Sequence, residues 1–139
     1  MGRGSGSFIG RGSGSAGDDG GGARCEGAEV VALGFNTPTE NLHYPEPPAL
    51  RVHHHLIMAQ SMAFQNATWL VETAKCGVED GFRMFGHSVI VAPSGEIAAK
   101  SQTEEDEVIC FNADIDLAAN LKKRSEEHTS ELQSRIRIS

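Results

Sequence analysis

The chain has 139 residues, of which 39% are hydrophobic, and its formal net charge is -7 at pH 7. Ten of the 16 glycines fall in residues 1–24, so the part able to form a hydrophobic core has about 100 residues, enough for one small domain. The negative charge is concentrated in residues 25–123, where six Lys or Arg face 14 Asp or Glu, and this argues against nucleic acid as a partner because binding to phosphate backbones depends on Lys and Arg.

Residues 1–24 contain the motif GRGSGS twice and offer too little apolar surface to form a core. We therefore expect this segment to be disordered. The alternative is contact with RNA, but only three arginines and one aromatic residue are available for it.

The first core element is the apolar run AEVVAL (residues 28–33), which ends before the turn signal Asn-Thr-Pro and predicts a buried strand. A Pro-rich loop follows over residues 38–48, and its last two prolines suit the first turn of a helix. We expect that helix over residues 49–65, where apolar positions recur at helical spacing and form a broad face suited to packing on a sheet. The face consists of two adjacent stripes, Leu50, His54, Ile57, Ser61 and Phe64, and Val52, Leu56, Ala59 and Ala63.

Further strands are expected in the second half of the chain. The stretch TWLVETA (residues 68–74) is rich in β-branched and aromatic residues. Residues 88–92 and 96–100 flank Pro-Ser-Gly, which predicts a hairpin in which Gly95 supplies a positive φ. Residues 107–113 alternate with the period of a strand. This order of elements predicts an α/β fold whose sheet has helices on at least one face.

The C-terminal segment RSEEHTSELQS (residues 124–134) resembles the translation of a common sequencing-library adapter. We therefore expect a disordered tail over residues 124–139, outside a domain that covers residues 25–123. The alternative is a short polar helix, because Glu127 and Glu131 are four residues apart.

Three consecutive histidines, His53, His54 and His55, suggest a metal site at first sight. Successive helical residues are separated by about 100° around the axis, so three in a row cannot converge on one ion, and no metal is predicted. His54 lies on an apolar stripe and is expected in the core or an interface. His53 and His55 are expected to be solvated or interfacial.

The three cysteines, Cys25, Cys76 and Cys110, form no CxxC pair and leave one over in any set of disulfides, which is typical of reduced thiols in the cytoplasm. Cys110 lies in a strand pattern and is expected to be buried, and Cys76 is expected to serve packing. The sequence has no apolar run long enough to span a membrane and no signal-peptide pattern, so we expect a cytoplasmic protein with no membrane partner. The acidic residues 104–107 are expected to form a solvated turn.

Five segments carry a family resemblance: GAEVVALGFNTP (27–38), QNATW (65–69), AKCGVEDG (74–81), GHSVIVAPSGEIAA (86–99) and EDEVI (105–109). From Gly27 to Asp116 the sequence resembles the carbon-nitrogen hydrolases of the nitrilase superfamily. The first three segments are most similar to the N-carbamoyl-D-amino acid amidohydrolases. The match corresponds to the C-terminal third of such an enzyme.

The resemblance implies a partial α-β-β-α sandwich and, for the parent enzyme, a Glu, Lys, Cys triad with no metal or organic cofactor. In that chemistry the cysteine thiolate attacks the carbamoyl carbonyl, the glutamate moves protons and the lysine stabilises the oxyanion. The implied substrate is a small N-carbamoyl amino acid, and the implied products are the D-amino acid, carbon dioxide and ammonia.

The chain departs from the family where the catalytic cysteine is expected. The family's nucleophile lies in a Cys-Asn-Asp-Arg motif upstream of the strand that matches residues 28–33, and here the Gly/Ser/Arg repeat occupies that region. Cys25 is too close to this strand to take the role, so no catalytic residue is assigned. Asn36 and Thr37 match family positions that bind the carboxylate end of the substrate. Turn formation ahead of Pro38 explains the same two residues without a substrate.

Three functions are therefore open. The first, a fragment of a carbamoylase that is itself inactive, explains the missing triad, the repetitive start and the adapter-like end together. The others are a small enzyme with Cys25 or Cys76 as nucleophile, and a non-catalytic interaction or oligomerisation module. Because a partial sandwich leaves one face of its sheet without a partner sheet, we also expect self-association.

Overall fold

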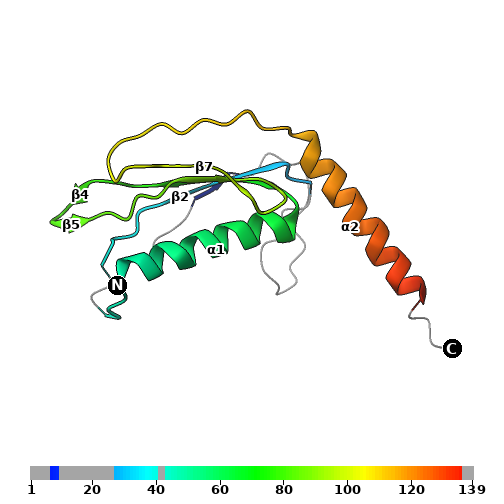
Figure 1. Ribbon diagram of the computed structural model, residues 1–139, viewed down its shortest axis with the longest axis horizontal. Helices are drawn as coiled ribbons and strands as arrows, with labels where there is room; N and C mark the ends of the chain where they lie inside the picture. Colours follow the sequence, from blue (N-terminus) through cyan, green and yellow to red (C-terminus); the bar gives the residue numbers. More distant parts are fainter. Residues whose placement is uncertain (1–6, 10–26, 41–42, 136–139) are drawn as a thin grey trace.

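The computed structural model describes residues 7–9, 27–40 and 43–135 (Figure 1). The elements in these ranges are β1 (Ser7–Ile9), β2 (Val30–Phe35), α1 (Pro48–Asn66), β3 (Trp69–Ala74), β4 (Val78–Glu79), β5 (Phe82–Arg83), β6 (Val89–Val91), β7 (Ile97–Lys100) and α2 (Asp116–Arg135). None of the helices in these ranges combines the length and the apolar character needed to cross a membrane.

The main sheet has the strand order β1-β2-β3-β6-β7. β2 and β3 are parallel and connected through α1, whereas the other neighbouring pairs are antiparallel. β4 and β5 form a separate small hairpin. The α/β fold expected from the order of elements is confirmed, and so is the hairpin of β6 and β7, where Gly95 has a φ of 86°.

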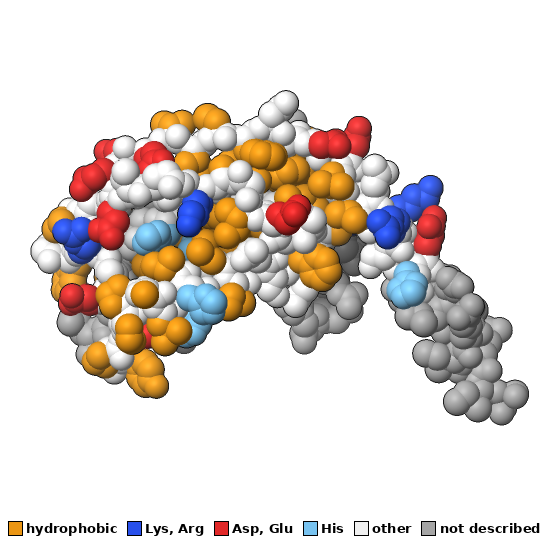
Figure 2. All heavy atoms as spheres, in the orientation of Figure 1, with side chains coloured by type: hydrophobic (Ala, Val, Ile, Leu, Met, Phe, Trp, Pro, Cys, Tyr) orange, Lys and Arg blue, Asp and Glu red, His pale blue; other side chains and the backbone are white. Residues whose placement is uncertain are grey.

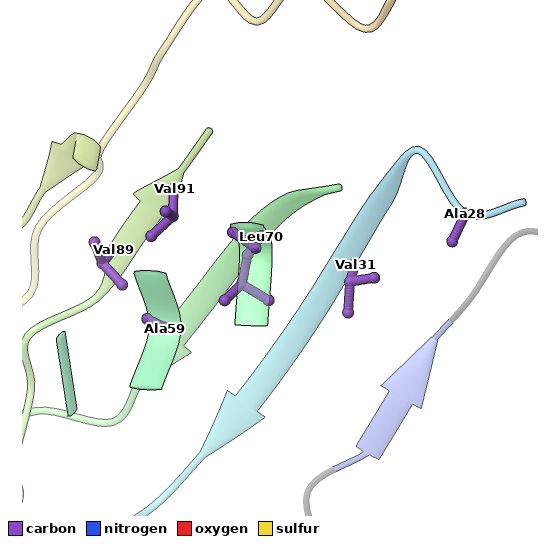
Figure 3. Close-up of a cluster of buried hydrophobic side chains, with 7 residues drawn as sticks. Ala28, Val31, Ala59, Leu70, Val89 and Val91 are labelled. Carbon is purple, nitrogen blue, oxygen red and sulfur yellow. The ribbon is translucent and has the colours of Figure 1, made fainter. Parts of the chain in front are cut away.

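The main core lies between α1 and one face of the sheet. Strand side chains alternate between faces, so Val31, Leu70, Val89 and Val91 all point to the helix and are at most 1% exposed (Figure 3). On the helix, Ala59 and Ala63 are fully buried against them. Small side chains at these two positions allow the helix to approach the sheet closely.

The position of α1 agrees with the sequence, but the prediction for its buried face was only half right. The helix begins at Pro48 and ends before Ala67, which has a left-handed φ of 46°. The stripe that includes Ala59 and Ala63 faces the sheet as expected. The neighbouring stripe is largely exposed, because the close approach at the two alanines turns it away from the sheet; its exposed members are Leu50 (41%), Ile57 (49%) and Phe64 (65%).

The strand expected over residues 107–113 does not form. This segment instead runs across the face of the sheet opposite α1 and leads into α2 (Figure 1). The indole N–H of Trp69 donates a hydrogen bond to the carbonyl oxygen of Asp114 at 2.9 Å, and the ring of Phe111 lies 5.6 Å from that of Trp69. The segment therefore packs on the face of the sheet through side chains rather than pairing with its edge.

The turn before this segment explains why it leaves the edge. As expected, residues 104–107 form an exposed acidic turn. The carboxylate of Glu107 accepts hydrogen bonds from the backbone N–H groups of Gln102 and Thr103, which bends the chain directly after β7. Within this segment only Ile109 and Ala113 are partly buried, and Phe111 is 49% exposed. Cys110 is exposed, so the prediction that it is buried was wrong.

Parts of both terminal segments have secondary structure in the described residues. Residues 7–9 form β1, which pairs with β2, and the rest of residues 1–24 lies outside the described part. α2 continues to Arg135, so the polar-helix alternative, rather than a disordered tail, describes residues 124–135.

Candidate functional site

A pocket of about 290 Å³ opens between α1 and the carboxyl end of β2. Ligand sites in α/β proteins often lie beyond the carboxyl ends of strands. Figure 2 shows histidine and hydrophobic side chains close together in the half of the molecule where α1 begins. The lining combines apolar side chains, from Phe35, Met58, Met62 and Phe85, with polar or charged ones, from Thr37, Glu46, Arg51, His54, His55 and Glu72.

Glu72 is the buried carboxylic acid of this pocket. It follows Leu70 by two residues on β3, so the strand places both side chains on the face covered by α1. The Glu72 side chain is 9% exposed, and its Oε2 has no hydrogen-bond partner in the described part of the chain. Burial raises the pKa of Glu72 to about 7, so the neutral acid and the carboxylate are both populated near neutral pH.

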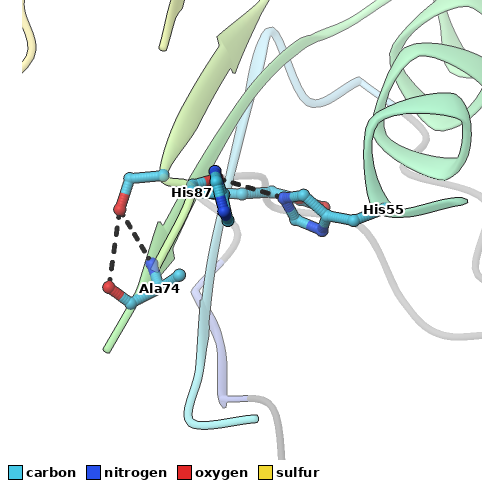
Figure 4. A network of polar contacts seen from close by, with 5 residues as sticks. His55, Ala74 and His87 are labelled. Carbon is cyan, nitrogen blue, oxygen red and sulfur yellow. Dashed lines mark hydrogen bonds and ion pairs between the residues drawn. The ribbon is translucent and has the colours of Figure 1, made fainter. Parts of the chain in front are cut away.

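His55 faces Glu72 from α1. Its Nε2 lies 3.4 Å from Glu72 Oε2 and 3.2 Å from the carbonyl oxygen of His87 (Figure 4). A carbonyl oxygen can only accept, so the His55 Nε2 carries the hydrogen of that bond. Burial lowers the pKa of His55, which favours the neutral ring with an unprotonated Nδ1. The rings of Phe35 and Phe85 lie 5.1 and 5.2 Å from the imidazole.

The backbone around His87 is fixed by its neighbour Ser88. The Ser88 hydroxyl oxygen accepts a hydrogen bond from the Ala74 N–H at 3.0 Å and lies 3.5 Å from the Ala74 carbonyl oxygen, which ties the start of β6 to the end of β3 (Figure 4). His87 itself has a left-handed φ of 60°, unusual for a residue other than glycine. The acceptor for His55 is therefore held in place from outside the helix.

The structure reverses the expected burial of the two histidines. His54, expected in the core or an interface, is 53% exposed and its Nδ1 lies 2.9 Å from Glu46 Oε1, so it does not belong to the core. His55, expected to be solvated or interfacial, is only 14% exposed. The reason is the orientation of α1, which turns the stripe of His54 outward. In the described residues no group of three or more His, Cys, Asp or Glu is placed to hold a metal ion.

Arg51 supplies the positive charge of the pocket wall. It lies one helical turn before His55, and its guanidinium carbon is 6.0 Å from the centre of the Phe85 ring. One of its N–H groups donates to the carbonyl oxygen of Thr39 at 2.7 Å. Because a guanidinium has several further N–H donors, Arg51 can bind an additional acceptor such as a carboxylate.

The two predicted substrate-binding residues follow β2 directly but lie in different surroundings. Thr37 lines the pocket and is partly buried, and its carbonyl oxygen accepts from the Phe85 N–H at 2.8 Å. Asn36 is exposed and is not part of the lining. The shape of the loop depends on backbone pairing, including a bridge between Pro38 and Met84. Substrate binding by Asn36 and Thr37 therefore stays a prediction.

Neither of the two described cysteines, Cys76 and Cys110, lines the pocket. The Cys76 thiol lies 3.1 Å from Asp106 Oδ1, and this hydrogen bond raises the pKa of Cys76, with the charges of Asp106 and Glu105 adding to the effect. A raised pKa leaves little thiolate at neutral pH, which argues against Cys76 as a nucleophile. Cys25 lies outside the described residues.

The family model and the sequence relatives of this chain agree with each other. The model of the carbon-nitrogen hydrolase family matches residues 24–123. A probable nitrilase of Schizosaccharomyces pombe is 31% identical over 67 residues, which cover 48% of this chain and 25% of that protein. A hydrolase in the agr operon of Staphylococcus lugdunensis is 29% identical over 76 residues, which cover 55% of this chain and 32% of that protein. The chain thus spans about a quarter to a third of these relatives.

Solved structures show the same fold. A carbon-nitrogen hydrolase from Helicobacter pylori G27 superposes with a TM-score of 0.58 at 21% identity, over 71% of this chain and 36% of that one. The NitFhit protein of C. elegans superposes with a TM-score of 0.56 at 21% identity, over 76% of this chain and 24% of that one. At this level of identity the likeness concerns the fold.

Proposed function

Because the chain belongs to the carbon-nitrogen hydrolase family, we propose that it is part of an N-carbamoyl-D-amino acid amidohydrolase, holds the carboxylate end of the substrate and does not catalyse hydrolysis alone. The observation that carries this proposal is the joint presence of Thr37 and Arg51 in one pocket at the carboxyl end of β2. A guanidinium is suited to binding a carboxylate. The substrate class comes from the resemblance of residues 27–38, 65–69 and 74–81 to the carbamoylases; of these segments, the first contributes Phe35 and Thr37 to the pocket.

The proposed parent reaction is hydrolysis of the bond between the carbamoyl carbon and the amino-acid nitrogen. One water is added, and the carbamoyl group leaves as carbon dioxide and ammonia. The family resemblance assigns none of the triad residues to positions 27–116, and the raised pKa of Cys76 disfavours it as a substitute nucleophile. The proposed role of the described domain is therefore to bind and orient the substrate.

Two assays on the full chain test this proposal. Ammonia release from N-carbamoyl-D-phenylalanine should not exceed the blank, and turnover that disappears in Cys76→Ser or Cys25→Ser would contradict the proposed inactivity. In ligand-observed NMR the same compound should bind, and Arg51→Met should weaken binding about tenfold, as expected for a lost charge-assisted hydrogen bond. Arg83→Met is the matched control, because Arg83 is exposed and pairs with Glu104 away from the pocket.

A non-catalytic interaction module is the second candidate. The observation that favours it is the exposed apolar side of α1, where Leu50, Ile57 and Phe64 are each more than 40% exposed. Exposed apolar residues grouped on one helix are typical of a contact surface. Self-association of the chain is the simplest form of this proposal.

A further inference from the structure

The pocket contains a buried acid whose role the proposed function does not explain. The Glu72 side chain is 9% exposed, and its Oε2 makes no hydrogen bond with the described residues. An unpartnered buried carboxyl group is costly, and such a group usually has a functional or ligand-related reason. The His55 Nε2–H, 3.4 Å from this oxygen, donates instead to the carbonyl oxygen of His87.

Two of the charged groups that line the pocket have no oppositely charged partner among the described residues. Glu46 pairs with His54, at the outer side of the helix. Arg51 contacts a carbonyl oxygen and an aromatic ring, neither of which neutralises its charge. Within the described part of the chain, neither Glu72 nor Arg51 has a charged hydrogen-bond partner, and both line the same cavity.

A ligand that satisfies both groups must carry a positive and a negative charge close together. Resting on the proposed function, we infer that this pocket binds a free α-amino acid as a zwitterion, with its carboxylate on Arg51 and its ammonium on Glu72. The volume of about 290 Å³ is at the small end for ligand pockets and suits a molecule of this size. Met58 and Met62 provide an adaptable apolar wall for the ligand's side chain.

The substrate and the product of the proposed reaction differ in charge at their amino-acid nitrogen. The nitrogen of an N-carbamoyl amino acid is uncharged, so its N–H makes a weaker hydrogen bond to Glu72 than an ammonium does. The pocket should therefore hold the free amino acid more tightly than the N-carbamoyl compound. In the proposed parent enzyme this would make the site retain the product.

The test compares D-phenylalanine with N-carbamoyl- and N-acetyl-D-phenylalanine on the full chain by saturation-transfer NMR, which tolerates self-association. D-phenylalanine should bind about tenfold more tightly than either derivative, in line with a charge-assisted bond. Glu72→Gln should weaken D-phenylalanine binding about tenfold and remove the difference between ligands. Glu79→Gln, at an exposed residue that pairs with Lys75, should change nothing.

A second measurement needs no variant. The groups facing the Glu72 carboxyl or lining its pocket are His55, His54 and Arg51 from α1 and Glu46 from the preceding loop. D-phenylalanine keeps its ammonium between about pH 6 and pH 8 while Glu72 ionises, so its affinity should rise several-fold over this range. Burial lowers the pKa of His55, which favours its neutral form over this range.

The outcomes separate the two proposals. Equal affinity for D-phenylalanine and its N-acyl derivatives, or an affinity that does not change with pH, would overturn the zwitterion inference and leave the carboxylate site of the proposed function intact. If Arg51→Met weakened the binding of none of these ligands, the proposed function itself would be overturned.

Discussion

Glu72 and His55 lie 3.4 Å apart, yet the hydrogen on the facing nitrogen of His55 is donated to the carbonyl oxygen of His87. The two side chains come from β3 and α1, which are consecutive in the chain and pack against each other. Burial shifts their pKa values in opposite directions, upward for Glu72 and downward for His55. Each shift disfavours the charged form, so the pair is most stable when both side chains are neutral.

The first prediction follows from Glu72. Because its pKa rises from 4.5 to about 7 on folding, the folded chain retains a proton that the unfolded chain releases, and stability is lost as the pH rises from about 4.5 through 7. The loss is about 3 kcal/mol at most. Urea unfolding at a series of pH values should show it, and Glu72→Gln should abolish this decline. An unchanged decline in Glu72→Gln would contradict the assignment.

The second prediction concerns His55, which should lower the stability of the fold at acid pH. Its pKa is lowered on folding from 6.5, so the unfolded chain binds the proton first and stability is lost as the pH falls below about 6.5. His55→Gln should reduce this acid-side loss and leave the loss caused by Glu72 in place. His53→Gln, at an exposed position on the same helix, is the matched control. If His55→Gln and His53→Gln lost the same stability at acid pH, burial of His55 would not be the cause of that loss.

The core between α1 and the sheet gives the third prediction. Leu70 is fully buried under the helix, so Leu70→Ala should lower the free energy of unfolding by about 2–5 kcal/mol. Val108→Ala removes a side chain that is 86% exposed and should cost less than about 0.5 kcal/mol. Chemical denaturation followed by circular dichroism measures both. Similar costs for the two variants would show that the helix does not cover β3 in solution.

The second face of the sheet is tested through Trp69. Trp69→Phe keeps an aromatic ring but loses the hydrogen bond to Asp114, which should cost about 1 kcal/mol and loosen the segment before α2. Amide hydrogen exchange in residues 107–115 should therefore accelerate. Phe82→Leu, a partly exposed site on β5, should leave exchange in this segment unchanged. Rapid exchange there already in the unaltered chain would contradict the packing described.

The fifth prediction concerns self-association. Leu50 and Ile57 are exposed on the outer side of α1, and their replacement by lysine should shift the chain toward smaller species in size-exclusion chromatography. Gln65→Lys adds the same charge at an exposed polar position and should have little effect. A monomer at all concentrations before any substitution would exclude association through this surface.

Local patterns predicted the elements whose causes are local. Pro48 begins α1 because its fixed φ suits the first turn of a helix, and Gly95 turns the hairpin because glycine tolerates a positive φ. Both effects can be recognised from a few neighbouring residues. The segment 107–113 was predicted as a strand because alternation shows which side chains are buried and not whether a neighbouring strand is there to pair with.

The candidate site depended on contacts that the sequence does not contain. Which of His54 and His55 faces inward was decided by how closely Ala59 and Ala63 approach the sheet. The sequence does contain one signal for this site, because Glu72 is the only charged residue of β3, whose other residues are uncharged. An acid in such a strand, on the same face as Leu70, indicates a buried carboxyl group.

We propose that the ligand binds in the pocket between α1 and β2. The decisive experiment is titration of the isotope-labelled full chain with D-phenylalanine, followed by NMR chemical shifts. We expect saturable shifts at Thr37, Arg51, His55 and Glu72, with little change at Val78 or Val108 outside the pocket. Saturable shifts confined to residues outside the pocket, or none at all, would contradict it.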